Sequence, residues 1–225
     1  MSGSRSTSVA IAATLVLAGG CWALTAERMS GMNMGVATEL GSLAFFLGIW
    51  APMMAAMMLP GAMPAISLRA RSSGVVRAVT PFVTSYIAVW TVVGALVYAL
   101  YRPHGTVLAG IVVIAAGVYE LTPVKRRCRT RCRQRVDSGF GFGLECVGSS
   151  IGLMAMLVVI GVMSLGWMAA IAVVIVAQKL LPARIALDLP VALAIVALGV
   201  VILASPSSVP GLMPSMSAAG PMHAM

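Results

Sequence analysis

Residues 50–64 read WAPMMAAMMLPGAMP and place two adjacent pairs of methionines four positions apart, Met53–Met54 and Met57–Met58. If the stretch is helical, Met53 lies beside Met57 and Met54 beside Met58, so that four sulfur atoms share one face. Leucine would fill the same volume without a ligand atom. The choice of methionine therefore suggests a role for sulfur.

The composition indicates that this stretch lies in a membrane. The chain has 225 residues, of which 60% are hydrophobic and only 9% are charged. Long apolar runs with few charges are typical of transmembrane helices. The predicted fold is all-α, a polytopic transmembrane helix bundle.

Several apolar runs are long enough to cross a hydrocarbon core. Five of them cover residues 9–26, 40–59, 79–101, 106–121 and 189–204. A sixth, residues 147–181, would be about 52 Å long as one straight helix, which is too long for one span. It is expected to break within Gly161–Trp167, which gives about seven spans.

Two prolines are expected to shape the second span at its inner end. Pro60 and Pro64 cannot donate a backbone hydrogen bond, so the helix should kink or end there. A kink beside four sulfur atoms could open a ligand site, and an ordinary helix end is the alternative.

The basic residues predict the orientation of the bundle. With the N-terminus inside, 13 of the 15 Lys and Arg residues fall on the inner side, and only Arg28 and Arg102 fall outside. The C-terminus is then outside, as in a multi-pass protein of the bacterial inner membrane. The basic loop at residues 125–135 is expected to anchor this topology and to contact acidic lipid headgroups. No nucleic-acid-binding module accompanies it, so nucleic acid is not an expected partner.

Three segments are expected. Residues 1–26 form an N-terminal span, which is a possible signal anchor, with a cleaved signal peptide as the alternative. Residues 27–204 form a metal-binding transmembrane domain. Residues 205–225 form a flexible, methionine-rich outer tail, because they are rich in Pro, Ser, Gly and Ala.

Soft metal ligands divide between the two sides of the membrane. Outer candidates are Met29, Met32 and Met34, with Met213, Met216, Met222 and His223 in the tail; inner candidates are Cys128, Cys132 and Cys146. Thiols outside a cell are prone to form disulfides, whereas thioethers are not. Methionine outside and cysteine inside is therefore the pattern expected of a protein that handles Cu(I), which prefers soft sulfur ligands.

Each group also has a plainer explanation. Methionine commonly fills gaps in apolar packing, and the tail could be compositional drift. Cys128 and Cys132 share a face if their loop is helical, and neighbouring arginines would favour the thiolate by lowering the pKa of each thiol. They could equally be ordinary cytosolic thiols. Zinc is a poor fit, because His is nearly absent and no Cys/His cage with the usual spacing is present.

Three stretches, in this order, resemble a known family. WAPMMAAMMLPGAMP, YELTPVKRRCRTRCR and GLECVGSSIGLMAMLVVIGVMSLGWMAAIAVVIVAQKLLP are similar to domain-of-unknown-function family 2182, predicted metal-binding membrane proteins that include copper chaperones for copper oxidases. The resemblance covers roughly residues 40–185. It implies metal ligation by Met53, Met54, Met57, Met58, Cys128, Cys132, Cys146, Met154 and Met163. The chain departs from the family pattern at Ser149 and Ser150, where relatives often have cysteines, and at Gln178–Lys179, where a Glu-Lys pair is usual.

The function expected from the sequence is Cu(I) binding and delivery to a copper-dependent oxidase or another cuproprotein. A transmembrane copper transporter and a structural membrane subunit without metal are the alternatives. No enzymatic activity is expected, since no nucleophile–base set or phosphate loop is evident and Glu120 and Glu145 fall near the inner surface. The sequence does not predict an oligomeric state.

Overall fold

The computed structural model describes residues 2–29, 41–73, 75–134, 136–161, 164–181, 188–209 and 212, which form helices and short connections without a strand. The helices are α1 Ser2–Met29, α2 Leu43–Ser73, α3 Thr80–Leu100, α4 Thr106–Glu120, α5 Pro123–Gln134, α6 Gly139–Gly161, α7 Leu165–Leu180 and α8 Asp188–Ala204, with a π-helical turn at Val75–Val79 and a 3-10 turn at Pro206–Ser208. The all-α prediction is confirmed for these residues.

Among the described residues, four helices are long and apolar enough to cross a membrane, over residues 6–29, 43–72, 77–100 and 139–161. A fifth span is possible if α4 and α5, which meet at a bend of 62°, form one broken span. The apolar helices α7 and α8 have only 16 and 17 residues. The multi-span character agrees with the sequence, whereas the number of seven spans is not confirmed.

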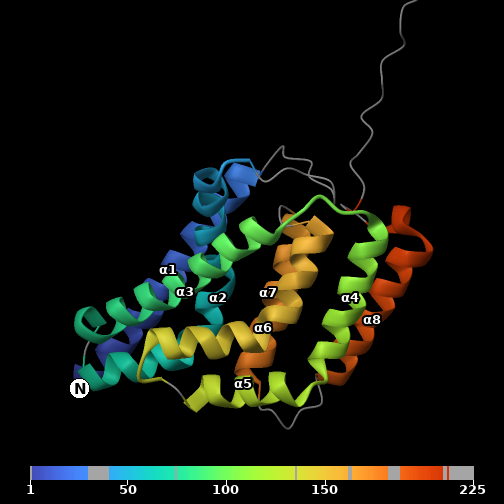
Figure 1. Ribbon diagram of the computed structural model, residues 1–225. Coiled ribbons are helices and arrows are strands. Elements are labelled where there is room, and N and C mark those ends of the chain that lie inside the picture. The colour runs from blue at the N-terminus through green and yellow to red at the C-terminus, as the bar shows by residue number, and fades with distance from the viewer. Residues whose placement is uncertain are drawn as a thin grey trace, which may run out of the picture.

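The helices alternate in direction so that the chain returns repeatedly to one side. In Figure 1 the N-terminus, the α2–α3 connection and α5 lie on the lower side, while the α3–α4 connection lies at the top. The break expected at Gly161 is present: α6 ends there with φ 145°, a conformation that favours glycine, and α7 begins at Leu165.

The prediction that α2 could end at Pro60 or Pro64 is wrong. The helix continues through Pro52, Pro60 and Pro64 as far as Ser73. From Met53 to Leu59 every residue is buried, so α2 is surrounded by other helices at this level. Such packing offsets the lost hydrogen bonds, which explains why prolines are tolerated within a membrane-type helix.

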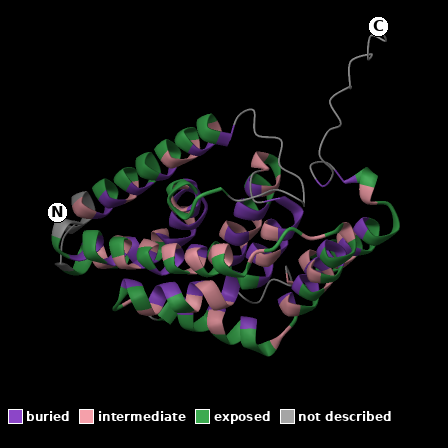
Figure 2. Cartoon of the chain, turned by 45° about the horizontal axis from the view of Figure 1, so that its top comes forward, coloured by how far each residue is buried: buried purple, intermediate pink, exposed green. Residues whose placement is uncertain are grey.

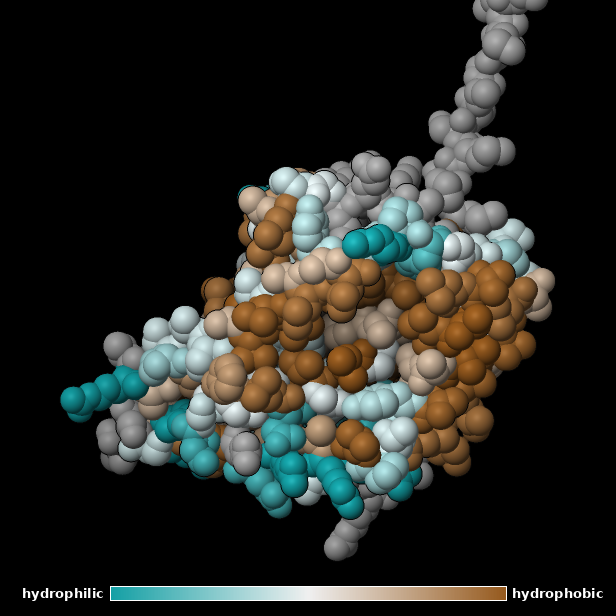
Figure 3. Space-filling model, in the orientation of Figure 1, coloured by the Kyte–Doolittle hydropathy of each residue, from teal (hydrophilic) through white to brown (hydrophobic). Residues whose placement is uncertain are grey.

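The outward faces of the bundle are apolar. Val92 and Leu96 on α3, Leu108 on α4 and Leu193 on α8 are more than half exposed. Figure 2 shows exposed turns on the outside of the helices and buried turns facing inward, and Figure 3 shows a hydrophobic band between hydrophilic residues at the lower and upper ends. An apolar girdle of this kind suits a lipid environment.

Glycines bring α4 and α8 into direct backbone contact. A Cβ on Gly117 would lie 2.7 Å from a side-chain carbon of Val196 and 3.0 Å from the carbonyl oxygen of Ala192. A Cβ on Gly199 would likewise lie 3.0 Å from the carbonyl oxygen of Gly110. Small residues allow close helix approach where lipid supplies no hydrophobic drive for association.

We expect Gly117→Ala to lower the free energy of unfolding by about 1–3 kcal/mol, because the added methyl group forces α4 and α8 apart. Gly48→Ala is the matched control, since a Cβ there meets nothing within 4 Å. Reversible unfolding in detergent micelles measures both. Equal stability of the two variants would show that the α4–α8 contact is not tightly packed.

Candidate functional site

The Cys146 thiol on α6 lies at the centre of the candidate site. It is fully buried, and Tyr86 on α3 places its hydroxyl oxygen 3.1 Å from the Cys146 Sγ. From α7, the ammonium of Lys179 donates to the same sulfur at 2.6 Å. A thiol that meets both a phenol and an ammonium in an apolar bundle sits in an unusually polar position.

Met58 brings a second sulfur atom to the same ammonium. Its Sδ lies 4.0 Å from the Lys179 Nζ. The lysine side chain reaches this point by passing over Gly61 on α2, where a Cβ would lie only 2.7 Å from the Lys179 Cδ. Gly61 therefore leaves the space that Lys179 needs.

Cys132 on α5 supplies the third sulfur atom. Its side chain is buried, with Sγ 4.0 Å from the carbonyl oxygen of Phe142. A hydrogen bond with Cys146 and then burial raise the pKa of Cys132 well above the usual range of a thiol, although the charge of Lys179 acts in the opposite direction. Met58, Cys132 and Cys146, from three different helices, are called the sulfur cluster below.

Cys128 lies one turn before Cys132 but faces a different neighbour. Their segment is helical as part of α5, which is the condition under which the two cysteines were expected to share a face. A Cβ on Gly148 would lie 2.7 Å from the Cys128 Sγ, which places that thiol against α6. Burial and then the charge and hydrogen bond of Glu145 raise the pKa of Cys128, while Arg131 lowers it less. Arg131 therefore acts on Cys128 in the expected direction, but burial and Glu145 outweigh it, so the pKa of this thiol is not lowered.

The other methionines expected on α2 are core residues. Met53, Met54 and Met57 are fully buried, like the alanines between the pairs. Burial thus does not single out the methionine face. The only methionine of this stretch with a described contact to Lys179 is Met58.

Met29 and Met154 lie apart from the cluster in the sequence and are buried in the core. Met154 follows Cys146 by eight residues on α6, about 12 Å along the helix axis, which is too far for one shared metal ion. The remaining expected ligands lie outside the described residues, and the prediction for them stays untested: Met32, Met34, Met163, Met213, Met216, Met222 and His223.

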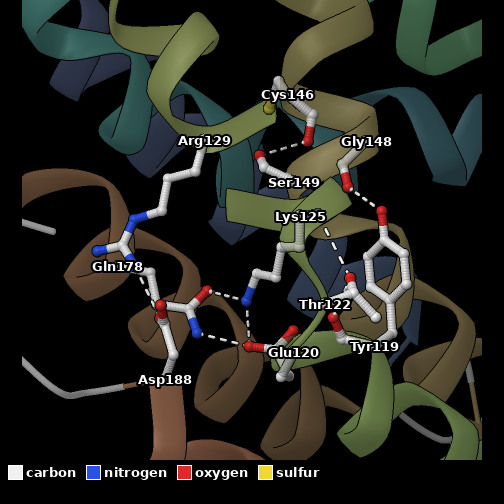
Figure 4. A network of polar contacts seen from close by, with 10 residues as sticks. All are labelled: Tyr119, Glu120, Thr122, Lys125, Arg129, Cys146, Gly148, Ser149, Gln178 and Asp188. Carbon is white, nitrogen blue, oxygen red and sulfur yellow. Dashed lines mark hydrogen bonds and ion pairs between the residues drawn. The ribbon is translucent and has the colours of Figure 1, made fainter. Parts of the chain in front are cut away.

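A buried polar network links the ends of α4, α5 and α7 (Figure 4). Glu120 is fully buried and forms an ion pair with Lys125, whose side chain is 1% exposed. Gln178 accepts from the Lys125 Nζ at 2.9 Å and donates to the Glu120 Oε2 at 2.7 Å. Glu120 is therefore not the ordinary surface carboxylate that the sequence suggested, because its charge is enclosed and compensated.

The ion pair between Glu120 and Lys125 does not fully compensate the burial of its two groups. Burial lowers the pKa of Lys125, and the charge and hydrogen bond of Glu120 oppose this shift. The Glu120 Oε1 is buried without a hydrogen-bond partner among the described residues. Breaking such a pair on one side leaves a buried charge, which is far more costly than removing both charges.

Two arginines fasten α5 to the neighbouring helices. Arg129 donates to the Asp188 Oδ1 at 2.7 Å, at the start of α8. Arg133 donates to the carbonyl oxygens of Lys179 and Leu181 at the end of α7. These contacts hold Cys132, which lies between the two arginines, against α6.

A cavity of about 270 Å³ adjoins the cluster at the α5 side of the bundle. Cys132 and Lys179 both line it, so one residue of the cluster and the lysine that contacts the cluster border this space. Arg129, Arg133 and Ser149 add polar groups, while α2 contributes an apolar wall. The cavity is a possible route for a small solute to the cluster.

The comparison with known families agrees with this sulfur-rich geometry. A model of the PpoB2 family, described as copper chaperone, matches residues 47–202. The chain belongs to the PpoB2 copper chaperone family. The copper-chaperone relationship expected from the sequence is therefore confirmed, although the match does not carry the name of family 2182. No curated protein and no solved structure matches the chain.

Membership of a copper chaperone family supports a copper-related function, and soft sulfur side chains are in keeping with it. Within the described ranges, no three His, Cys, Asp or Glu side chains are grouped closely enough to hold a metal ion. Thioether sulfur, which Met58 supplies beside the cysteines, is a further soft ligand type that suits copper.

Two residues of the site were missed as functional residues. Lys179 appeared only as part of a departure from the family pattern, and Tyr86 did not stand out at all. A signal existed for the lysine, because an ionisable residue within an apolar run is a functional candidate by default. The approach of Tyr86 depends on the packing of α3 against α6, which no local pattern encodes.

We expect Glu120→Ala to lower the free energy of unfolding by about 3–5 kcal/mol, because Lys125 is left buried without its counter-charge. The double variant Glu120→Leu/Lys125→Met removes both charges and should remain closer to the parent. Asp137→Ala, at an exposed position, is the control. Unfolding in detergent measures all three, and a double variant less stable than Glu120→Ala would contradict the expected coupling.

Proposed function

We propose that this chain binds Cu(I) at the sulfur cluster and passes it to a copper-requiring partner. The observation that carries the proposal is the convergence of soft sulfur on a single cation. The Lys179 ammonium lies 2.6 Å from the Cys146 Sγ and 4.0 Å from the Met58 Sδ, and Cys132 lines the same cavity as Lys179.

Two thiolates and one thioether form a ligand set that suits Cu(I). Soft thiolate and thioether ligands select Cu(I) over the harder ions that prefer oxygen. Both thiols must lose their protons to bind, so loading releases protons and depends on pH. Met58 cannot be protonated or oxidised to a disulfide, and it supplies a neutral third ligand.

Delivery to a partner is supported by the position of the cluster. Cys132 lies on the short basic helix α5 and lines the cavity, so the metal would be held near one end of the bundle. A partner that offers a stronger sulfur or imidazole site could collect the ion there. A copper-dependent oxidase or another cuproprotein is the acceptor that we propose, in keeping with the description of the family as copper chaperone.

We further propose that the bundle is a multi-pass protein of the bacterial inner membrane, with the N-terminus inside and the C-terminus outside. The apolar outer faces of the helices and the 13-to-2 division of basic residues support this orientation. In this orientation α5 lies on the inner side, where thiols stay reduced. That is also where a Cu(I) site with two cysteines would be chemically stable.

Ser72→Cys and Ser207→Cys test the orientation, because both serines are exposed and lie on opposite sides in this topology. We expect a membrane-impermeant thiol reagent added to intact spheroplasts to label position 207 and not position 72. The parent chain, with its four cysteines, measures the background. The reverse labelling pattern would show that the topology is the opposite one and that the sulfur cluster lies on the oxidising side.

Met58→Leu tests the ligand set. Leucine matches methionine in volume, so this change should cost less than about 1.5 kcal/mol in packing, while removing a ligand atom. We expect Met58→Leu and Cys146→Ser each to weaken Cu(I) binding by about tenfold or more. Anaerobic titration against a competing Cu(I) chelator measures the affinity, and sulfur and copper X-ray absorption measures the ligands.

Met53→Leu is the matched control, because Met53 is equally buried on the same helix but has no described contact with Lys179 or Cys146. Its Cu(I) affinity should equal that of the parent. If Met53→Leu weakens binding as much as Met58→Leu, the binding site lies elsewhere along α2. If neither variant changes binding, methionine serves only packing here.

A further inference from the structure

We infer that Lys179 makes the sulfur cluster selective for monovalent over divalent soft metal ions. This inference rests on the proposed function, because it concerns the same cluster. It assigns Lys179 a role in metal selectivity that neither the sequence pattern nor the family description includes.

Lys179 is held beside the cluster by contacts on both sides. Its ammonium donates to the Cys146 Sγ, and its alkyl chain lies against Gly61, which has no side chain to exclude it. The backbone carbonyl of Lys179 accepts from Arg133, which fixes the end of α7. The ammonium is thus a built-in charge next to the metal ligands.

The net charge of the loaded cluster follows from its components. Two thiolates carry two negative charges, the ammonium carries one positive charge, and the Met58 thioether is neutral. A monovalent ion such as Cu(I) brings the sum to zero, whereas a divalent ion such as Zn(II) leaves one uncompensated positive charge. An isolated charge is costly in a buried, apolar site.

Two of the described carboxylates near the cluster are already paired with other cations. Glu120 pairs with Lys125, and Asp188 pairs with Arg129. The charge of Glu145 acts on both Cys128 and Cys132, and it is the same in the parent and in every Lys179 variant. Lys179 differs from it because its ammonium is in direct contact with a ligand of the cluster.

The ammonium need not occupy the position of the metal. Lys179 lines the cavity beside the cluster, so its side chain has room to move aside while staying close to the thiolates. From there it can still donate to a thiolate that also binds the metal. A neutral assembly of metal, thiolates and ammonium is consistent with the apolar surroundings on α2 and α6.

Charge can be separated from other metal properties by comparing ions with the same electron configuration. Cu(I) and Zn(II) both have a filled d shell and differ by one charge, as do Ag(I) and Cd(II). The test compares the ratio of the Zn(II) to the Cu(I) dissociation constant, and of the Cd(II) to the Ag(I) constant, in the parent and in Lys179→Gln. Measurements at one fixed pH in detergent, by competition with chelators, give all four constants.

We expect Lys179→Gln to lower both ratios by about tenfold or more, the size of effect that a neighbouring charge has on other buried ionic equilibria. Lys179→Arg keeps the charge and should restore ratios close to those of the parent. Arg126→Gln removes one positive charge from an exposed position on α5 and should leave the ratios unchanged.

The outcomes separate this inference from the proposed function. If the parent binds neither Cu(I) nor Ag(I), the proposed function fails. If the parent binds both but Lys179→Gln weakens all four ions equally, Lys179 only supports the fold and the inference is overturned. Unchanged ratios in Lys179→Gln, or an equal change in Arg126→Gln, would also overturn it.

Discussion

Removing an ammonium group from water is expensive, and this cost governs the end of the bundle where α5 lies. Lys125 is 1% exposed and Lys179 is partly buried, in a chain with few charges. Each therefore needs partners nearby. Lys125 has Glu120 and Gln178, whereas Lys179 has sulfur. The first arrangement is an ordinary solution for a buried charge, and the second places an ammonium where a soft cation could bind.

The two arrangements depend on each other through α5. This helix is too basic to lie in the apolar layer, yet Lys125, Arg129 and Cys132 on one of its faces are buried. Arg129 and Lys125 attach that face to α8 and to α4 and α7, so that the same face presents Cys132 to Cys146. Ion pairs at the end of the bundle thus set the geometry of the sulfur cluster. A loss of either ion pair should disturb the thiols as well as the fold.

Much of the fold could be predicted from the sequence, because the length of an apolar run and the backbone preference of a glycine are both properties of a short stretch of chain. The apolar runs correspond to helices, and the break at Gly161 follows from a backbone conformation that favours glycine. The path of α2 could not be predicted, since its passage through Pro60 and Pro64 depends on neighbouring helices that surround it. The number of spans could not be predicted either, because α7 and α8 are apolar like the longer helices but have only 16 and 17 residues.

The sequence predicted which kinds of side chain form the site better than it predicted how they are arranged. Sulfur spacing along α2 suggested four equivalent methionines, but Lys179 contacts only Met58 among them, because Gly61 opens that side of the helix one turn later. Spacing also could not show that Cys132 meets Cys146 while Cys128 faces Gly148, since both contacts form between helices that are separate in the sequence.

The opening stretch has a more specific explanation in the structure than its repetition suggests. From Met53 to Leu59 the helix is enclosed on all sides, so three of the four methionines have surroundings that leucine could share. Methionine is unbranched and flexible, and it suits a helix that must be packed all round while prolines disturb its hydrogen bonds. Met58 differs because its neighbour on α7 is the charged ammonium of Lys179. A thioether is polarisable and tolerates both an ammonium and a metal ion at that distance, whereas leucine offers neither of them a lone pair. Packing therefore accounts for the run as a whole, and the contact with Lys179 accounts for sulfur at its last position.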